Sequence, residues 1–228
     1  MDTLPIATPS LESMVIISPD VPPLVSIAPL RLGVLASGNG SNLEAIAQSI
    51  TQHQLPAQIQ VLVYNNPSAL AAERADRLGI PKVLLNHREF ASREALDEAI
   101  VTTLHQHQVE WVIMAGWMRI VTPVLINAFP NQILNIHPSL LPSFPGIRAV
   151  EQALAAGVKI AGCTVHRVIT AVDSGSIMIQ AAVPVLPNDT PETLSQRIQV
   201  QEHIIFPRAI ALVAAESAQR SPSSQAHC

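Results

Sequence analysis

The chain of 228 residues has little of several residue types on which common functional sites depend. Only two lysines occur, Lys82 and Lys159, and no basic run is present. Because nucleic-acid surfaces are built from clustered Lys and Arg, we expect no nucleic-acid partner. The two cysteines, Cys163 and Cys228, lie far apart and form no metal-ligand pattern. They predict no metal site and fit a reducing compartment, so a cytoplasmic protein is expected.

Long apolar runs are missing as well. No run approaches the roughly 18 apolar residues that a membrane span needs. The first ten residues, MDTLPIATPS, lack the basic start and the unbroken apolar segment of a secretory signal. Hydrophobic residues make up 48% of the chain, charged residues 13%, and the formal net charge is −4. These values predict a globular protein with a substantial core and no membrane partner.

The two ends of the chain differ in composition from its middle. Residues 1–30 hold six of the 19 prolines and no lysine or arginine, and the tail reads SAQRSPSSQAHC. Such segments offer too little apolar surface to form a packed core. We expect a disordered extension over 1–30, a single folded domain over 31–216 and a disordered tail over 217–228.

The middle of the chain alternates between strand-like apolar runs and segments with apolar residues at helical spacing. Strands are expected at 31–37, 59–65, 82–85, 111–116 and 132–136, and helices at 41–50, 69–79, 91–107 and 122–129. Continuous apolar strands separated by helices are typical of a parallel sheet covered on both faces. The pattern therefore predicts an α/β, Rossmann-like fold.

The last third of the domain has a different order. Two strand-like segments, 162–168 and 176–185, are separated only by a turn, which predicts an antiparallel pair. A long final helix is expected from Thr190, where a cap is followed by a proline in the first turn, to about residue 215, with a kink at Pro207.

Three polar loops follow predicted strands of the parallel sheet. They read SGNGSN at 37–42, GWMRIV at 116–121 and NIHP at 135–138. Because ligands of such sheets bind beside the carboxyl ends of the strands, we expect the three loops to form one site.

The first of these loops, SGNGSN, resembles an anion-binding turn. Its glycines let the backbone turn sharply, and the N–H groups at the following helix start favour an anion. A dinucleotide fingerprint needs a third glycine where Leu43 stands, and a nucleotide P-loop needs a lysine that is missing here. The loop therefore predicts a site for a single phosphate group. The alternative is a plain tight turn with Ser41 as a helix cap.

The third loop begins with an Asn-x-His pair. Residues two apart in a strand face the same side, so Asn135 and His137 are expected to point together. An amide donor beside an imidazole can stabilise an oxyanion and transfer a proton. The alternative is that Asn135 satisfies a loop carbonyl and His137 caps a turn. Three prolines between residues 138 and 145 stiffen the chain that follows.

An aspartate in the turn TAVDSG is a candidate partner for this pair. Asp173 lies among apolar strands, where a carboxylate can orient His137 and favour its charged form. The alternative is an ordinary turn aspartate. The six other histidines before the tail, among them His105 and His107, have no visible partners and are expected at the surface.

Six motifs in this order resemble one enzyme family, the folate-dependent phosphoribosylglycinamide formyltransferases of purine synthesis. They read ASGNGSNLEAI, AGWMRIV, LNIHPSLLPSFPG, GCTVH, VDSGSIMIQ and QEHIIFP, and the resemblance covers about 31–212. The motif around Asn135 marks the wider folate formyltransferase group, and SGNGSN matches the glycinamide ribonucleotide branch. The family often has Phe at Trp117 and Gly at Ser174.

The resemblance implies a role for each motif. It implies that Asn135, His137 and Asp173 are catalytic, and that Asn135 also contacts the folate. The residues it assigns to the ribonucleotide are Gly40, Ser41, Asn42 and Glu202. Those it assigns to the folate are Arg93, Met118, Arg119, Ile120 and Val121. It further implies 10-formyltetrahydrofolate as co-substrate, 5'-phosphoribosylglycinamide as acceptor, no metal, and a monomer or homodimer.

Three other functions are alternatives to this one. A formyltetrahydrofolate hydrolase carries a regulatory domain ahead of the catalytic one, for which 30 proline-rich residues are too few. A methionyl-tRNA formyltransferase needs a further domain and a basic surface. A non-catalytic phosphometabolite-binding protein on the same fold would not need the combination of Asn135, His137 and Asp173.

Overall fold

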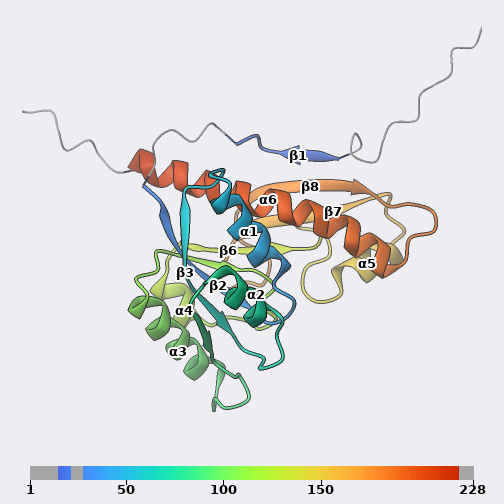
Figure 1. The fold of residues 1–228 in the computed structure, drawn as a ribbon. Coiled ribbons are helices and arrows are strands. Elements are labelled where there is room, and N and C mark those ends of the chain that lie inside the picture. The colour runs from blue at the N-terminus through green and yellow to red at the C-terminus, as the bar shows by residue number, and fades with distance from the viewer. Residues whose placement is uncertain (1–14, 22–27, 221–228) are drawn as a thin grey trace, which may run out of the picture.

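The computed structural model describes residues 15–21 and 28–220 of the chain. An eight-stranded sheet runs through this part in the order β1-β8-β7-β6-β5-β2-β3-β4 (Figure 1). Parallel pairing joins β2 (Leu30–Ala36), β3 (Ala57–Tyr64), β4 (Lys82–Leu84), β5 (Trp111–Met114) and β6 (Ile133–His137). Antiparallel pairing then adds β7 (Ile160–Arg167), β8 (Ile177–Pro184) and β1 (Ile16–Ser18).

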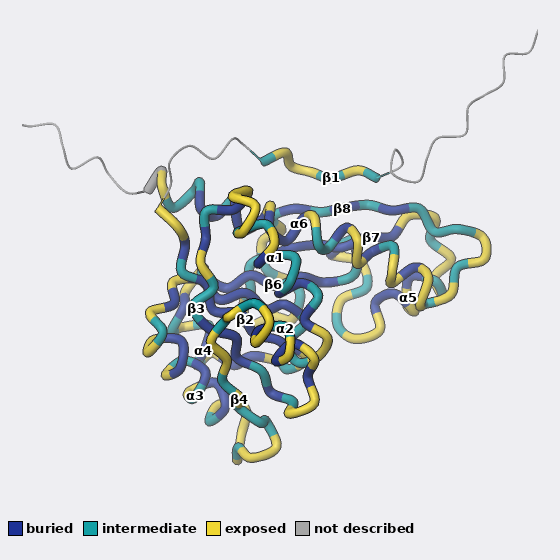
Figure 2. Tube along the Cα trace, in the orientation of Figure 1, coloured by how far each residue is buried: buried dark blue, intermediate teal, exposed yellow. Residues whose placement is uncertain are grey.

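Helices cover both faces of the sheet. One face packs against α1 (Ser41–Thr51), α2 (Ala71–Leu78), α5 (Ala149–Ala155) and α6 (Pro191–Arg220). The other packs against α3 (Arg93–Gln106) and α4 (Pro123–Ala128). Successive residues of a strand face opposite sides of the sheet. In β2, Val34 belongs to the core under α1, α2, α5 and α6, and its neighbour Leu35 belongs to the core under α3 and α4. Figure 2 shows buried residues along the central strands, and the predicted α/β fold with helices on both faces is confirmed.

The strand order reverses at β2: β3 and β4 lie on one side of it, and β5 and β6 lie on the other. The loops that leave β2 and β5 meet at this point. The backbone N–H of Ser37 donates to the carbonyl of Gly116 (3.0 Å), and the N–H of Met118 donates to Ser37 Oγ (2.9 Å). Open α/β sheets bind their ligands in the crevice at such a reversal.

The beginning of the chain differs from the sequence prediction. Residues 16–18, expected within a disordered extension, form β1 on the free edge of β8, with Ile17 opposite Ala181. Val15, Ile17 and Val21 pack against the core. Three residues are too few to show a strand period in the sequence, whereas a sheet edge offers unpaired backbone groups to any extended segment. The remaining parts of the predicted extension, 1–14 and 22–27, lie outside the described residues.

The end of the chain also differs in detail. Helix α6 continues through Pro207 and reaches Arg220, so it enters the predicted tail by a few residues. Residues 221–228 lie outside the described part. Although α6 has 30 residues, no helix in the described ranges is long and apolar enough to span a bilayer. The sequence patterns also missed α5, which has only seven residues.

Candidate active site

The site is built on the antiparallel pair β6 and β7. Asn135 lies opposite His166, and His137 lies opposite Thr164. On β7, Cys163 and Val165 belong to the core under α6. Thr164 and His166 alternate with them along the strand and therefore face the opposite side of the sheet. Asn135 and His137 share that side because residues opposite one another in a pair project from the same face.

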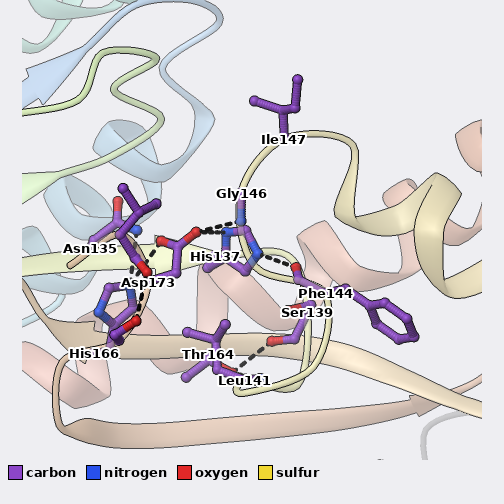
Figure 3. A network of polar contacts seen from close by, with 12 residues as sticks. Asn135, His137, Ser139, Leu141, Phe144, Gly146, Ile147, Thr164, His166 and Asp173 are labelled. Carbon is purple, nitrogen blue, oxygen red and sulfur yellow. Dashed lines mark hydrogen bonds and ion pairs between the residues drawn. The ribbon is translucent and has the colours of Figure 1, made fainter.

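His137 is the last residue of β6 and is 6% exposed. Its Nε2 lies 2.9 Å from the carbonyl oxygen of Phe144, and its Nδ1 lies 3.4 Å from Asp173 Oδ2 (Figure 3). A carbonyl oxygen and a carboxylate oxygen only accept hydrogen bonds. Both ring nitrogens therefore face hydrogen-bond acceptors.

Asp173 lies between two imidazoles. Its Oδ2 faces His137 and accepts the backbone N–H of Gly146 at 2.8 Å, and its Oδ1 lies 3.5 Å from His166 Nε2. Burial raises the pKa of Asp173, but the contact with His166, the Gly146 hydrogen bond and the nearby His137 ring outweigh this effect. The net pKa lies below the usual value for aspartate, so the carboxyl group is charged at neutral pH.

His166 belongs to the same network. Its side chain is 3% exposed, its Nδ1 lies 2.9 Å from the carbonyl oxygen of Arg167, and its Nε2 lies 3.1 Å from Asn135 Nδ2. The expectation that all six other histidines lie at the surface is wrong for His166. Sequence spacing gave no signal for this residue, because only the strand register brings it opposite Asn135.

Buried hydrogen bonds hold the loop that follows His137. Thr164 Oγ1 donates to the carbonyl of Ser139 (2.6 Å) and accepts the backbone N–H of Leu141 (3.1 Å). Gln180 Nε2 donates to the carbonyl of Leu141 (2.9 Å), and Ser139 Oγ donates to that of Ser143 (2.6 Å). Figure 3 shows Ser139, Leu141 and Thr164 of this network close to His137. These hydrogen bonds hold the loop that follows β6.

The phosphate-loop candidate lies at the start of α1. Gly40 has φ +77°, in the left-handed region, and a Cβ placed on it would lie 2.7 Å from backbone and side-chain atoms of Ala71. Glycine is required here both for its conformation and for the close approach of α2. Arg74 donates to the carbonyl (2.9 Å) and Oδ1 (2.7 Å) of Asn39, which holds the loop from the side of α2.

The two residues after Gly40 contact α6. Ser41 Oγ accepts a hydrogen bond from Gln199 Nε2 (3.1 Å), and Asn42 Nδ2 donates to Glu202 Oε2 (2.9 Å). Burial raises the pKa of Glu202, although the Asn42 hydrogen bond opposes it. Thus four residues predicted to act together, Gly40, Ser41, Asn42 and Glu202, are adjacent. Gln199 joins them, and a polar pocket of about 340 Å³ opens beside Ser41.

The folate candidates are divided between two places. Met118 and Ile120 are 81% and 55% exposed in the loop after β5, and Val121 is buried. This loop is anchored at its end by Asp97 Oδ2, which accepts the backbone N–H of Thr122 (2.6 Å). Arg93 is an exposed residue at the start of α3, and within the described residues no hydrogen bond or ion pair joins it to the loop of Met118 and Arg119.

The strand ends bring most of the candidates to one edge of the sheet. The loops after β2 and β5 are hydrogen-bonded to each other, and β6 lies beside β5. Within the described residues, no group of three or more His, Cys, Asp or Glu side chains is arranged to hold a metal ion. The arrangement offers an amide, an imidazole and a carboxylate near the glycine-containing loop that precedes α1.

Comparisons with known proteins identify relatives in sequence and in structure. The family model for formyl transferases matches residues 30–210. The phosphoribosylglycinamide formyltransferase of Bacillus subtilis (strain 168) is 43% identical over 180 residues, which are 79% of this chain and 92% of that protein. The crystal structure of glycinamide ribonucleotide transformylase 1 from Symbiobacterium toebii superposes with a TM-score of 0.81 at 47% identity, over 82% of this chain and 89% of that one.

Longer relatives also match. The human trifunctional purine biosynthetic protein adenosine-3 is 44% identical over 189 residues, which are 83% of this chain but only 19% of that protein. The chain therefore spans less than a fifth of the trifunctional relatives. The resemblance inferred from the six motifs is confirmed, and the chain belongs to the phosphoribosylglycinamide formyltransferase family.

Proposed function

We propose that this chain transfers the formyl group of 10-formyltetrahydrofolate to the amine of 5'-phosphoribosylglycinamide. The reaction replaces one carbon–nitrogen bond with another. The glycinamide nitrogen attacks the formyl carbon, a tetrahedral oxyanion forms, and the bond from carbon to N10 of the folate breaks. One proton leaves the attacking amine, and one proton is gained by the departing N10.

Asn135 and His137 are proposed to stabilise the oxyanion. Donors that are fixed before the reaction stabilise developing charge without reorganising, and loss of one such donor typically lowers kcat by about 10²–10³-fold. Asn135 supplies amide N–H groups, and His137 supplies a positive charge. The carboxylate of Asp173, 3.4 Å from His137 Nδ1, favours this charged form.

His137 also holds a proton that can move to the leaving nitrogen. In the structure this Nε2–H donates to the carbonyl of Phe144. Direct proton transfer therefore requires that the substrate replaces the carbonyl at Nε2. Phe144 has φ +54°, a strained conformation for a bulky residue, in a loop that also has positive φ at Arg148. We propose that this loop adjusts when substrate binds.

The phosphate of the ribonucleotide is proposed to bind at the start of α1. Free backbone N–H groups of the first helical turn, the Ser41 hydroxyl and the amide of Gln199 offer donors without a net charge. Glu202 and Asn42 lie next to them and are proposed to bind hydroxyl or amine groups of the same substrate.

The folate is proposed to bind along the loop after β5. Apolar side chains at Met118 and Ile120, together with backbone groups up to Val121, suit a flat heterocycle that needs an apolar slot and a few hydrogen bonds. Arg93 is proposed to bind a carboxylate at the far end of the folate. A cytoplasmic location and a monomeric or homodimeric state also remain predictions.

The observation that carries the proposal is the pairing of His137 with two acceptors beside an amide, at the edge of the sheet where SGNGSN lies. The test is to mix the protein with both substrates and follow the deformylated folate by absorbance. Product that forms only when the ribonucleotide is present supports transfer. Product formed equally without it indicates a hydrolase, and no product indicates a binding protein.

Ser41→Asp tests the placement of the phosphate. A carboxylate at this position would repel the phosphate, so ribonucleotide affinity should fall at least about tenfold while folate affinity stays within about twofold, as expected for like charges in a partly desolvated loop. Calorimetric titration of each ligand measures this. Equal losses for both ligands would contradict the placement.

A further inference from the structure

Arg74 is a charged residue of α2 to which the proposed chemistry gives no role. Its side chain is 24% exposed and reaches from α2 to the loop that precedes α1. The Nε atom donates to the backbone carbonyl of Asn39 at 2.9 Å, and Nη2 donates to the side-chain Oδ1 of the same residue at 2.7 Å. A planar guanidinium that binds two acceptors of one residue fixes both the position and the orientation of that residue.

A second hydrogen bond joins α2 to this loop. The backbone N–H of Ala71 donates to the carbonyl of Gly38 at 3.1 Å. Two successive carbonyls of the loop, those of Gly38 and Asn39, are therefore directed towards α2. Ala71 makes its contact through the backbone, whereas the contact with Asn39 depends on the side chain of Arg74.

The direction of these carbonyls determines the direction of two N–H groups. The cis peptide bonds of the described residues lie elsewhere, so both peptides are trans, and in a trans peptide the C=O and N–H point to opposite sides. The N–H groups of Asn39 and Gly40 therefore point away from α2. Within the described residues, no hydrogen bond to a protein acceptor uses either of them. Successive N–H groups beside a left-handed residue such as Gly40 (φ +77°) form a concave site that suits an anion.

Arg74 also supplies a positive charge that the loop itself lacks, because the segment SGNGSN holds no Lys, Arg or His. Arg74 lines the polar pocket beside Ser41, together with Glu44 and His203. Burial and the charge of Arg74 lower the pKa of His203, which favours its neutral form. Glu44 pairs with both Arg74 and Arg77, so this group of three charged side chains keeps one positive charge in excess.

We propose that Arg74 is a positioning residue for the phosphate site, which orients the Asn39–Gly40 peptide so that the Gly40 N–H faces the phosphate of the ribonucleotide. The guanidinium acts through Asn39 and through its charge, without contact with the phosphate. The proposal rests on the placement of the phosphate at the start of α1 under the proposed function. It makes the shape of the loop dependent on a side chain 35 positions away in the sequence.

Inorganic phosphate tests this orientation without any catalysis. In the full chain labelled with ¹⁵N and assigned by triple-resonance spectra, added phosphate should shift the Gly40 amide signal of the wild type. In Arg74→Gln the shift at the same phosphate concentration should fall to less than about a third, because a charge-assisted hydrogen bond that holds the peptide is lost. No shift in the wild type, or an equal shift in Arg74→Gln, would overturn the proposal.

Three variants test the consequence for the substrate. Arg74→Gln should raise KM for the ribonucleotide about 10- to 30-fold and change KM for the folate less than about twofold, as for loss of a hydrogen bond to a charged group at one ligand only. Arg74→Lys keeps the charge but not the two-pronged contact, so it should recover part of the loss. Arg77→Gln is the matched control, since Arg77 pairs with the same Glu44 and, within the described residues, makes no hydrogen bond to the loop. It should leave both KM values close to those of the wild type.

The outcomes separate a positioning role from a structural one. Loss of a merely structural contact would lower Tm and affect both substrates alike. Equal increases of the two KM values in Arg74→Gln, or the same ribonucleotide KM increase in Arg77→Gln, would therefore overturn the proposal. If the wild type transfers no formyl group, the proposed function fails, whereas a phosphate shift of Gly40 that depends on Arg74 would still support the positioning role.

Discussion

The parallel and antiparallel halves of the sheet contribute to the site in different ways. In the parallel half, β2 and β5 each end in a loop whose residues are neighbours in the sequence, such as Gly40, Ser41 and Asn42. In the antiparallel half, Asn135, His166 and Asp173 come from separate segments and meet through strand register. In the proposed function, the parallel half supplies backbone N–H donors for ligands, and the antiparallel half supplies the carboxylate and imidazole side chains.

Asp173→Asn should have the largest effect, because it removes the charge of the antiparallel half while it keeps the shape. We expect kcat to fall about 10²-fold, in the range of lost acid–base assistance, with little change in substrate binding. The pKa of Asp173 lies below its usual value, so the carboxylate itself stays charged through neutral pH.

A matched control for this variant is Asp189→Asn. Asp189 pairs with Arg197 at the start of α6, where its Oδ1 and Oδ2 accept hydrogen bonds of 2.8 and 2.6 Å. Its loss should lower Tm and leave kcat unchanged. An unchanged kcat in Asp173→Asn, or an equal loss in Asp189→Asn, would contradict a role for Asp173 beside His137.

Gly40→Ala tests the parallel half in the same manner. Its Cβ would lie 2.7 Å from Ala71, and its φ is +77°. The loop must therefore shift, at a stability cost of about 1–3 kcal/mol. KM for the ribonucleotide should rise much more than KM for the folate, with kcat at saturation reduced less than in Asp173→Asn.

Gly38→Ala is the control in the same loop, because a Cβ there meets nothing within 4 Å. It should leave both the ribonucleotide KM and Tm close to those of the wild type. If Gly38→Ala and Gly40→Ala behave alike, close packing against α2 is not what shapes the loop.

Ile17→Asp tests whether the edge of the antiparallel half matters for stability alone. Ile17 packs against the core from β1, so its replacement should cost about 1–2 kcal/mol and lower Tm by a few degrees. Because β8 and β7 lie between β1 and β6, kcat should not change. Ile16→Asp on the same strand, with Ile16 69% exposed, should have little effect on Tm.

Asp97→Asn should have the smallest effect and concerns the loop after β5. Burial raises the pKa of Asp97 more than its hydrogen bonds with Thr122 lower it. For an acid whose folded-state pKa is raised, the charged form opposes folding, and this cost appears as pH rises above the unfolded-state pKa of about 3.9. Asparagine keeps the acceptor for the Thr122 N–H without the charge.

The expected result for Asp97→Asn is a Tm equal to or slightly above that of the wild type at pH 7. The difference should shrink as pH is lowered and Asp97 takes up its proton. A lower Tm for Asp97→Asn at pH 7 would show that the charge itself stabilises the loop. Calorimetric scans at several pH values decide between these outcomes.

The parallel core was predictable from the sequence because its signals are local. Apolar runs such as 111–116, the helical spacing around Leu43 and the turn before Ser41 each lie within one short segment. Strand and helix periods therefore predicted the order of these elements and the edge where the loops meet. Residues two apart in one strand, Asn135 and His137, could be placed together for the same reason.

Tertiary structure alone decided which distant residues complete the site. His166 is buried because the β6–β7 register puts it opposite Asn135, 31 positions away in the sequence. The edge position of β1 depends on an unpaired strand, which no local pattern in residues 16–18 reveals. Local periodicity depends on neighbouring side chains, whereas cross-strand partners depend on register, and register is set only when the whole sheet packs.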